Sequence, residues 1–379
     1  MATSGSIALH LDHYGRAAWR RVLRLAERFD QQPLIARWLY QPGPPPGLKQ
    51  EVLHEVVERA GYGRCSRVGH RHISGWKDAG AYRVSVGLAD GRVLRLVHKN
   101  ALYKEREFPA LEGLGRRPGH GEYAVYRSLA GPTARFLPTV LFAEELEPER
   151  HYSYLMADLM PEYRMCSSRP ADLIKICAVL PELHAELQIL TDRHIASSLV
   201  AFDHAFTLQL LAYAKEALVP YAAMRPNSEV ASLVSDWEVV ANAYRRGADL
   251  AYSCQPMILI HGDYNPNNVM LCRRGDHLKA IDFEWFGWGL PQMDLASALK
   301  GAAASLREDC AARFARRDGA ASPAEERCTF EFCVLQRALF DAAFIAKQLP
   351  RLPAKARASF ERILLRSASR ARTSAAAGF

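Results

Sequence analysis

The sequence predicts a mixed α+β fold in which a small antiparallel sheet precedes a larger, mostly helical part. Alternating apolar and polar residues on both sides of an Asp-Gly pair indicate a β-hairpin over residues 81–99. From Pro170 onward, apolar residues recur mainly at helical spacing. Core packing does not explain one stretch, in which a short apolar strand runs directly into His-Gly-Asp at residues 261–263.

The composition is that of an ordinary globular protein. The chain has 379 residues, 49% of them hydrophobic and 24% charged, which is enough for two domains or two lobes. No apolar run approaches the ~18 residues of a membrane span, and the N-terminal stretch lacks the apolar segment of a signal peptide. We therefore expect a cytoplasmic protein with no membrane partner. None of the eight cysteines forms a CxxC pair or a zinc-finger spacing, so we expect buried, reduced thiols.

The net charge of +8 raises the question of nucleic acid as a partner. The basic excess lies toward the two ends of the chain, with 23 Lys and Arg against 17 Asp and Glu in residues 1–159 and 14 against 8 in residues 301–379. Residues 160–300, which contain His-Gly-Asp, hold 12 against 16 and are mildly acidic. A groove for a phosphate backbone would be basic around the reactive residues, so the sequence disfavours nucleic-acid binding.

The N-terminal third is expected to hold helices and then strands. Residues 14–40 and 48–60 have helical periodicity and are separated by a proline-rich stop, so residues 1–68 form a predicted helical N-terminal extension. A sheet-containing lobe is predicted over residues 69–160. Its expected elements are strands at 81–88, 92–99 and 151–156 and a helix at 122–129.

The remaining chain is predicted to form a helical lobe over residues 161–353 and a basic helical tail over residues 354–379. The expected helices are 170–190, 203–219, 228–252, 292–315, 323–349 and 354–372. Between them, a short strand at 257–260 precedes a hairpin whose strands are 268–272 and 277–283.

This hairpin presents a set of polar side chains suited to magnesium. Asp263 is expected to end one strand, Asn268 to start the next, and Asp282 to end its partner strand. Pro266 makes the loop between the first two rigid. Two carboxylates and one amide would then converge, and Mg²⁺ prefers such oxygen ligands. Kinases have the same arrangement for phosphoryl transfer: an Asp, an Asn five residues later, and a second Asp after a hairpin.

The segments HGDYNPNN and IDFEW resemble the aminoglycoside phosphotransferase family and related small-molecule kinases, which have a two-lobed protein-kinase-like fold. The resemblance covers roughly residues 70–350. It implies ATP and Mg²⁺ as cofactors, Asp263 as the catalytic residue that accepts the proton of the attacking hydroxyl, and Asn268 and Asp282 as metal ligands. Protein kinases carry His-Arg-Asp and Asp-Phe-Gly instead.

Further residues follow from the same resemblance. Asp294 in GWGLPQMDLAS is expected to hold the catalytic hairpin, and His184 in LPELHAEL is a support residue. His261 is interpreted as a hydrogen-bonded scaffold residue. Trp285 and Trp288 are either core or cover residues or surfaces on which the substrate stacks.

In the sheet lobe, the resemblance implies a Lys and a Glu that orient the ATP phosphates. Lys99 is the chosen lysine, and Arg95 on the same strand face is a competitor. Glu122 is the chosen glutamate, and Glu105 and Glu107 are alternatives. Lys99 and Glu122 could also be ordinary exposed residues.

Two backbone segments complete the predicted nucleotide site. Residues 74–84 stand where the phosphate-covering loop is expected, and Gly75 and Gly80 would let the backbone approach the phosphates, unless they are simple turn glycines. Residues 155–160 stand where the hinge is expected, so the backbone near Ala157 and Leu159 would bind adenine.

The predicted function is an ATP-dependent phosphotransferase that acts on a hydroxyl of a small molecule. Acidic residues in the expected substrate region favour a cationic acceptor, such as an aminoglycoside-like or other aminated natural product; they are Glu216, Glu229, Asp236, Glu238 and Asp249. Antibiotic resistance and phosphorylation of a sugar or choline-type metabolite are both open roles.

Two hypotheses from other classes remain. A protein kinase would have an activation segment after Asp282, but Asp294 follows only twelve positions later. A non-catalytic nucleotide-binding module would bind Mg-ATP without consuming it.

Overall fold

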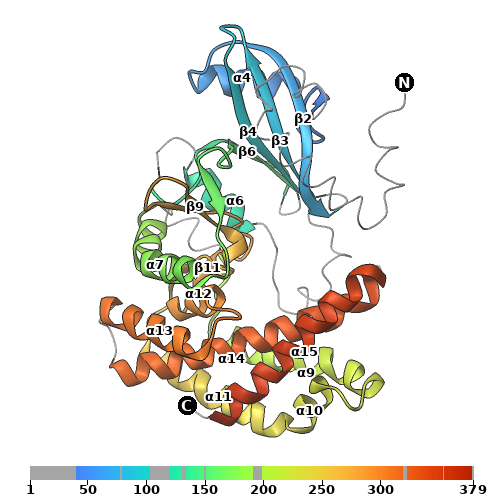
Figure 1. The fold of residues 1–379 in the computed structure, drawn as a ribbon, viewed down its shortest axis with the longest axis vertical. Helices are drawn as coiled ribbons and strands as arrows, with labels where there is room; N and C mark the ends of the chain where they lie inside the picture. The colour runs from blue at the N-terminus through green and yellow to red at the C-terminus, as the bar shows by residue number, and fades with distance from the viewer. Residues whose placement is uncertain are drawn as a thin grey trace. The chain divides into compact units, whose positions relative to one another are not determined.

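The structure is a computed structural model that describes residues 40–76, 79–102, 120–129, 134–148, 151–190, 199–318, 322–352 and 354–377. The chain divides into two compact units (Figure 1). The first unit comprises residues 1–100 and 153–158, and the second comprises residues 101–152 and 159–379. The helix predicted at 14–40 lies outside the described residues except for Tyr40.

The first unit contains an antiparallel sheet with the strand order β1-β2-β3-β4-β6. Its elements are β1 (Gln41–Pro42), α4 (Gln50–Arg59), β2 (Cys65–Trp76), β3 (Ala79–Leu88), β4 (Val93–Leu102) and β6 (His151–Ala157). The long hairpin of β3 and β4 pairs Val84 with Leu96 and Val86 with Leu94. The predicted hairpin at 81–99 is therefore confirmed, and its strands are longer than expected.

Local chemistry explains the turn and the core of this unit. The Asp90 carboxylate accepts hydrogen bonds from the backbone N–H and from the Nε–H of Arg92, which closes the turn. Leu53 and Val57 of α4 and Val84, Val86 and Leu96 of the sheet are fully buried or nearly so. Residues 65–68, expected at the end of a helical extension, instead begin strand β2.

The second unit is mostly helical. Its longer helices are α6 (His120–Leu129), α7 (Pro170–Leu190), α9 (His204–Met224), α11 (Trp237–Cys254), α13 (Ala304–Asp318), α14 (Pro323–Gln348) and α15 (Ala354–Ala377), and its shorter ones are α10 (Glu229–Ser235) and α12 (Pro291–Ala298). Helix α14 packs against α9, α11, α12, α13 and α15 and is the central helix of this unit. A full capping box at Ser322 and Glu325 starts α14.

Two predicted helices are each broken into two. The helix expected at 228–252 ends after Ser235 as α10 and restarts at Trp237 as α11, while the helix expected at 292–315 ends at Ala298 and restarts at Ala304. In contrast, α7 occupies the predicted residues 170–190.

Small sheets carry the polar loops. One sheet has the order β10-β9-β7, from β7 (Tyr163–Met165), β9 (Val269–Cys272) and β10 (Leu278–Ala280). The other pairs β8 (Ile258–Ile260) with β11 (Gly287–Gly289), so Trp288 lies opposite Leu259. Strand β5 (Val140–Glu147) also belongs to the residues of the second unit. Strands β5, β7 and β11 were not predicted from the sequence.

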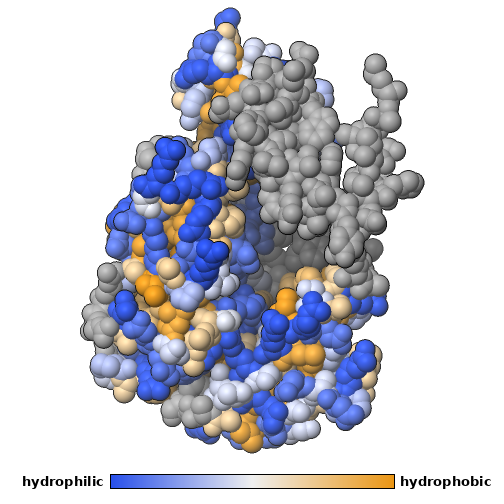
Figure 2. Space-filling model, viewed as in Figure 1, coloured by the Kyte–Doolittle hydropathy of each residue, from blue (hydrophilic) through white to orange (hydrophobic). Residues whose placement is uncertain are grey.

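Within the described part of the chain, no helix combines the length and the apolar character that crossing a membrane requires. On the face drawn in Figure 2, hydrophilic side chains predominate and hydrophobic ones form separate patches. All eight cysteines are free, as expected, but only four of them are buried, whereas burial was expected for all.

Candidate active site

Gly262 lies in the loop after β8, and its surroundings explain why glycine stands between His261 and Asp263. Its φ is +78°, in the left-handed region that favours glycine. A Cβ atom here would lie 2.0 Å from the carbonyl oxygen of Trp285. The loop can therefore pass this close to the backbone of Trp285 only with glycine at position 262.

The fully buried Asp294 holds this loop from helix α12. Its carboxylate accepts hydrogen bonds from the backbone N–H groups of His261 and Gly262, both at 2.8 Å. The Nε2 atom of His184, from α7, contacts the same carboxylate at 2.9 Å. The contacts confirm the predicted support roles of Asp294 and His184, because a buried carboxylate needs such partners and here they are loop amides.

His261 is a scaffold residue, as predicted. Its ring is fully buried and lies 4.2 Å from the ring of Phe283 between centroids. Nε2 is 3.0 Å from the carbonyl oxygen of Ile281, and Nδ1 is 3.3 Å from the backbone N–H of Asp263. Because a carbonyl can only accept and an N–H only donate, the ring hydrogen is on Nε2. Both ring nitrogens are therefore used in holding the loop.

Asp263 and Asn268 meet across the loop. The Asn268 amide Nδ2 donates to Oδ2 of Asp263 at 2.9 Å and to the Asp263 carbonyl at 3.0 Å. Asn265 accepts a hydrogen bond from the backbone of Asn267, and Pro266 starts the single 3₁₀ turn (Pro266–Asn268) between them. This turn places the two side chains together.

The strand ends differ slightly from the expectation. Strand β8 ends at Ile260, three residues before Asp263, and β9 begins at Val269, directly after Asn268. Strand β10 ends at Ala280, two residues before Asp282. The polar residues therefore lie in the loops beside the strands, where side chains are less constrained by pairing.

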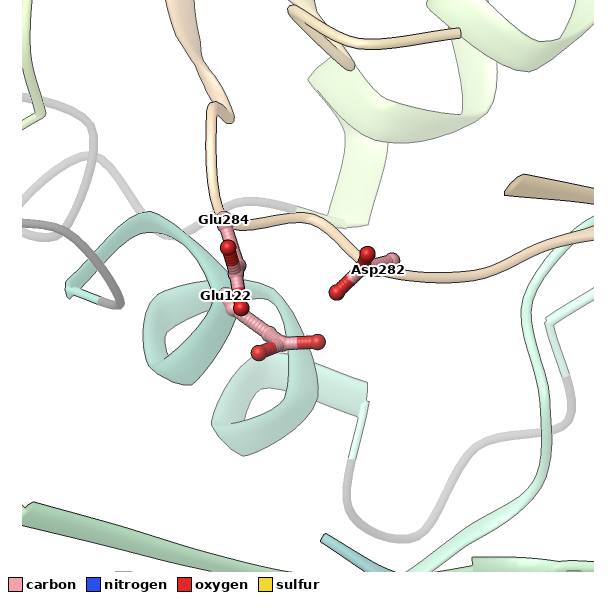
Figure 3. A group of neighbouring side chains, drawn as sticks. All are labelled: Glu122, Asp282 and Glu284. Carbon is pink, nitrogen blue, oxygen red and sulfur yellow. The ribbon is translucent and has the colours of Figure 1, made fainter. Parts of the chain in front are cut away.

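Asp282 lies in a group of three carboxylates. Ligand atoms of Glu122, Asp282 and Glu284 all lie within 4.8 Å of one another. Figure 3 shows Glu122 reaching from helix α6 toward the loop that carries the other two. The φ of Asp282 is +67°, which makes it the one non-glycine residue with positive φ among those described. Such strain is typical of functional sites.

This donor set fits a hard divalent cation. Three carboxylates this close repel one another unless a cation or protons intervene, and carboxylate oxygens are the ligands that Mg²⁺ prefers. The backbone N–H of Ile281, next to Asp282, donates to the carbonyl of Asn268 at 2.9 Å. The predicted ligand Asn268 is thus tied to the same hairpin. Glu284 was not predicted, although it stands two residues after Asp282.

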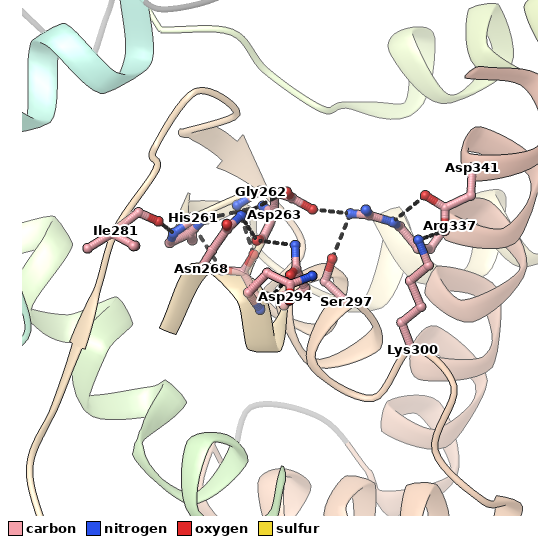
Figure 4. Close-up of polar contacts among 12 residues, drawn as sticks. His261, Gly262, Asp263, Asn268, Ile281, Asp294, Ser297, Lys300, Arg337 and Asp341 are labelled. Atoms are coloured by element: carbon pink, nitrogen blue, oxygen red, sulfur yellow. Dashed lines mark hydrogen bonds and ion pairs between the residues drawn. The ribbon is translucent and has the colours of Figure 1, made fainter. Parts of the chain in front are cut away.

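Arg337 of helix α14 forms an ion pair with Asp263, with 2.8 Å between Nη1 and Oδ1. Nη1 also donates to Ser297 at 2.7 Å, and Nε contacts Asp341 at 3.1 Å. Lys300 completes this chain of contacts at 2.7 Å from Asp341 (Figure 4). Arg337 was not predicted, because it lies 74 positions after Asp263 and no local pattern points to it.

A cavity of about 370 Å³ in the second unit reaches Asp263 and Gly262. Trp285 and Arg337 are among the residues that line it. Trp288 is not among them and instead lies in the β8–β11 pair. The two tryptophans that the sequence could not distinguish therefore have different positions.

The predicted nucleotide residues of the first unit lie on its sheet. Lys99 pairs with Ala81 across β3 and β4, and Arg95 pairs with Ser85; both are half-buried, so burial does not separate them. Gly75 pairs with Gly80 at the end of the β2–β3 hairpin, so the predicted loop is strand over most of its length.

The predicted hinge residues lie at the end of β6 and just beyond it. Ala157 is the last residue of β6, next to Asp158, which forms a buried ion pair with Arg83 at 2.6 Å. The carbonyl of Leu159, in the second unit, accepts hydrogen bonds from Glu162 and Tyr163. Glu122 is fully buried in the second unit, and Glu105 and Glu107 lie outside the described residues.

A comparison with protein families supports this assignment of the site region. The model of the phosphotransferase enzyme family matches residues 171–331, which include Asp263, Asn268, Asp282 and Asp294. This match confirms the predicted resemblance over residues 171–331, which are less than half of the chain. No curated protein matches the chain.

Solved structures of small-molecule kinases are similar to this chain. A mutant aminoglycoside 2'-phosphotransferase-IIIa in complex with GDP has a TM-score of 0.55 at 13% identity, with 84% of this chain and 97% of the other covered. Choline kinase LicA from Streptococcus pneumoniae has a TM-score of 0.52 at 13% identity, with 86% and 99% covered. The gentamicin complex of APH(2'')-IIa has a TM-score of 0.51 at 15% identity, with 86% and 99% covered. The likeness shows the fold and confirms the predicted α+β, protein-kinase-like class.

Proposed function

We propose that the protein transfers the γ-phosphate of ATP to a hydroxyl group of a small molecule. The observation that carries this proposal is the contact between Asn268 and Asp263 on a loop held by Asp294. The loop lies within the residues that the phosphotransferase family model matches, and Asp263 lines a cavity of the size that small-molecule sites have.

In this proposal Asp263 receives the acceptor. Its carboxylate is oriented on one side by the Asn268 amide and on the other by Arg337. An acceptor hydroxyl in the cavity would donate its hydrogen to this carboxylate, which fixes the oxygen for attack. The oxygen forms a bond to the γ-phosphorus, the bond from phosphorus to the β–γ bridging oxygen breaks, and ADP leaves with the electron pair. The hydroxyl proton passes to Asp263.

Asp282 and Asn268 are proposed to hold Mg²⁺, and the structure adds Glu284 to the candidate ligands. The Asn268 Nδ2 is used by Asp263, so its amide oxygen is the atom available for a metal. When bound, the ion would neutralise charge on the phosphates. Glu122 either belongs to this set or serves as the partner of Lys99, and the two roles differ in whether its loss changes the affinity for Mg²⁺.

The remaining nucleotide contacts are proposed for Lys99, with Arg95 as the alternative, and for the backbone at Gly75, Gly80, Ala157 and Leu159. One of the similar structures is a GDP complex, which supports a nucleoside diphosphate as the product. We propose ATP as the donor.

The experiment is a transfer assay on the full chain with γ-labelled ATP, Mg²⁺ and a collection of hydroxylated small molecules. Label transferred to an acceptor, with one equivalent of ADP formed, supports the proposal. Mg-ATP binding by calorimetry without acceptor phosphorylation would support the non-catalytic module instead. Label found only on proteins added as substrates would support a protein kinase.

A further inference from the structure

We infer that the acceptor is an uncharged alcohol with an apolar, ring-containing body, and not a polycation. This inference rests on the proposed function and concerns the cavity beside Asp263. The cavity holds about 370 Å³ and is lined by residues of helices α9, α14 and α15 and of the loops around Asp263 and Trp285.

Aromatic side chains form much of the cavity wall. They are Phe202, Phe206, Trp285, Phe340, Phe344 and Phe360. Trp285 packs edge-on against Phe340 with 5.0 Å between ring centroids, and Phe340 stacks on Phe344 at 6.0 Å. All three of these rings are only half-buried, so part of each is left for a ligand. Such a wall favours apolar rings, because burial of apolar area is the main gain available.

The charges that line the cavity cancel. Two are acidic, Asp263 and Asp341, and two are basic, Arg337 and Lys300. Arg337 lies between the two acids, at 2.8 Å from Asp263 and 3.1 Å from Asp341, and Lys300 lies 2.7 Å from Asp341. Both carboxylates therefore already have a basic partner. A ligand with several ammonium groups would have to displace these partners or be buried without counter-charges, and both are costly.

The acidic residues that favoured a cationic acceptor in the sequence do not line this cavity. Four of them form ion pairs elsewhere in the second unit: Glu216 with Lys347, Glu229 and Asp236 with Arg372, and Glu238 with Lys215. The fifth, Asp249, lies 2.7 Å from Nε2 of His204. All five acidic side chains are exposed. Three basic side chains, Lys347, Arg372 and Lys215, offset part of this negative charge at the surface, and none of the five carboxylates faces the cavity, so they give no reason to expect a polycation in it.

A quaternary ammonium alcohol is the strongest competing acceptor, since aromatic walls bind such cations. The protein already places a cation against this wall. The guanidinium carbon of Arg337 lies 5.9 Å from the centroid of the Phe340 ring. A second cation near Phe340 would be repelled by Arg337, whereas an uncharged ring would not.

The test measures binding and transfer separately on the full chain. Three kinds of probe are used: neutral alcohols with one to four fused rings, choline, and kanamycin. Calorimetry without nucleotide gives the affinities, and the γ-labelled ATP assay gives kcat/KM. We expect at least one neutral ring alcohol to bind at least tenfold more tightly than choline or kanamycin and to accept phosphate with the highest kcat/KM.

Phe344→Ala removes one wall ring and is expected to weaken binding of the neutral alcohol at least fivefold, while the affinity for Mg-ATP stays unchanged. Met224→Ala is the matched control, because Met224 is 68% exposed and does not line the cavity. A melting curve confirms that both variants fold.

Tighter binding or faster phosphorylation of choline or kanamycin would overturn the inference and leave the proposed kinase intact. Failure of all neutral alcohols to bind would also overturn it. Binding of a neutral alcohol that is abolished by Phe344→Ala, with no phosphate transferred, would support the ligand class and count against the proposed function.

Discussion

Arg337 and Asp263 form an ion pair that joins helix α14 to the loop after β8, with 2.8 Å between Nη1 and Oδ1. Burial alone would lower the pKa of Arg337, but the charges of Asp341 and Asp263 and their hydrogen bonds raise it above its ordinary value. The guanidinium is therefore a fixed positive charge beside the carboxylate that is proposed to receive the acceptor.

Replacing Arg337 should reduce turnover through misplacement of Asp263. We expect Arg337→Met to lower kcat by about 10- to 100-fold, because small displacements of a positioning group have effects of this size. Arg337→Lys keeps the positive charge but not the planar guanidinium. Its kcat should therefore lie between that of Arg337→Met and that of the wild type. Steady-state kinetics with the best acceptor from the screen measures both.

Arg337→Met also changes the net charge of the cavity wall. In Arg337→Met, Asp263, Asp341 and Lys300 leave one net negative charge, so the affinity for choline should rise relative to that for neutral alcohols. A general loss of folding would lower every affinity together and shift the melting curve. An unchanged kcat and an unchanged preference for charge would contradict a role for Arg337 at this site.

Gly262→Ala should distort the loop that carries Asp263. The added methyl would meet the Trp285 carbonyl oxygen at 2.0 Å, in addition to the strain of a positive φ, so we expect a loss of more than about 2 kcal/mol in the free energy of unfolding or a displaced loop with little activity. Gly301→Ala is the control, since Gly301 has a similar φ of +86° with nothing within 4 Å. It should cost only about 1 kcal/mol. Equal effects in denaturant titrations of the two variants would show that the close approach to Trp285 does not matter.

Asp282 and Glu284 should control binding of Mg²⁺. Titration of MgCl₂ in the presence of a non-hydrolysable ATP analogue measures this affinity without turnover. We expect Asp282→Asn and Glu284→Gln each to weaken it at least tenfold, since loss of outer contacts of metal ligands already has effects of about 10- to 100-fold. Asn tolerates positive φ well, so Asp282→Asn leaves the backbone unperturbed.

The matched control for the metal site is Asp276→Asn, on the exposed turn of the β9–β10 hairpin. It should leave the affinity for Mg²⁺ unchanged. Glu122→Gln separates the two roles proposed for Glu122. Weaker binding of Mg²⁺ would make Glu122 a metal ligand. Weaker binding of nucleotide with unchanged affinity for Mg²⁺ would instead support its role with Lys99. Normal Mg²⁺ affinity in both the Asp282 and the Glu284 variants would exclude this group of carboxylates as the metal site.

Asp172 should make the free energy of unfolding depend on pH in the acidic range. Its carboxylate is hydrogen bonded to Arg164 at 2.7 and 2.8 Å and to Ser167, and these contacts, those of Arg164 first, hold its pKa well below the ordinary value. A lowered folded-state pKa stabilises the protein fully above the unfolded-state value of about 4. The stabilisation is lost as the pH falls below 4 toward the folded-state pKa.

We therefore expect Asp172→Asn to lower the free energy of unfolding by about 1–2 kcal/mol at pH 7, a modest value because Arg164 is partly exposed. The difference from the wild type should shrink as the pH is lowered below about 4. Urea titrations between pH 3 and 7 measure it, with the exposed Glu238→Gln as a control expected to lie within about 0.5 kcal/mol of wild type. A difference that grows toward acid would contradict this account.

The sequence predicted those features that depend on neighbouring residues. The hairpin of β3 and β4 follows from alternation around Asp90-Gly91, and α7 follows from a long periodic segment that ends at Leu190. The contact of Asp263 with Asn268 depends on one short loop, so spacing and a proline were enough to predict it.

Features that depend on distant packing could not be predicted in this way. Arg337 reaches Asp263 only because α14 packs against α12, and nothing in the local sequence of α14 marks this arginine. The cavity is formed by side chains from five separate segments, so neither its aromatic wall nor its balanced charge is visible in a linear pattern. The acidic residues of the substrate region looked available because their basic partners, such as Lys347 and Arg372, lie more than a hundred residues away.

The central claim is that Asp263 serves phosphoryl transfer and not nucleotide binding. The most direct measurement compares Asp263→Asn with wild type for label transferred from γ-labelled ATP to the best acceptor, alongside the affinity for Mg-ATP. We predict a loss of about 10²- to 10⁴-fold in kcat with Mg-ATP affinity within twofold of wild type. Turnover close to that of the wild type in Asp263→Asn would contradict the account.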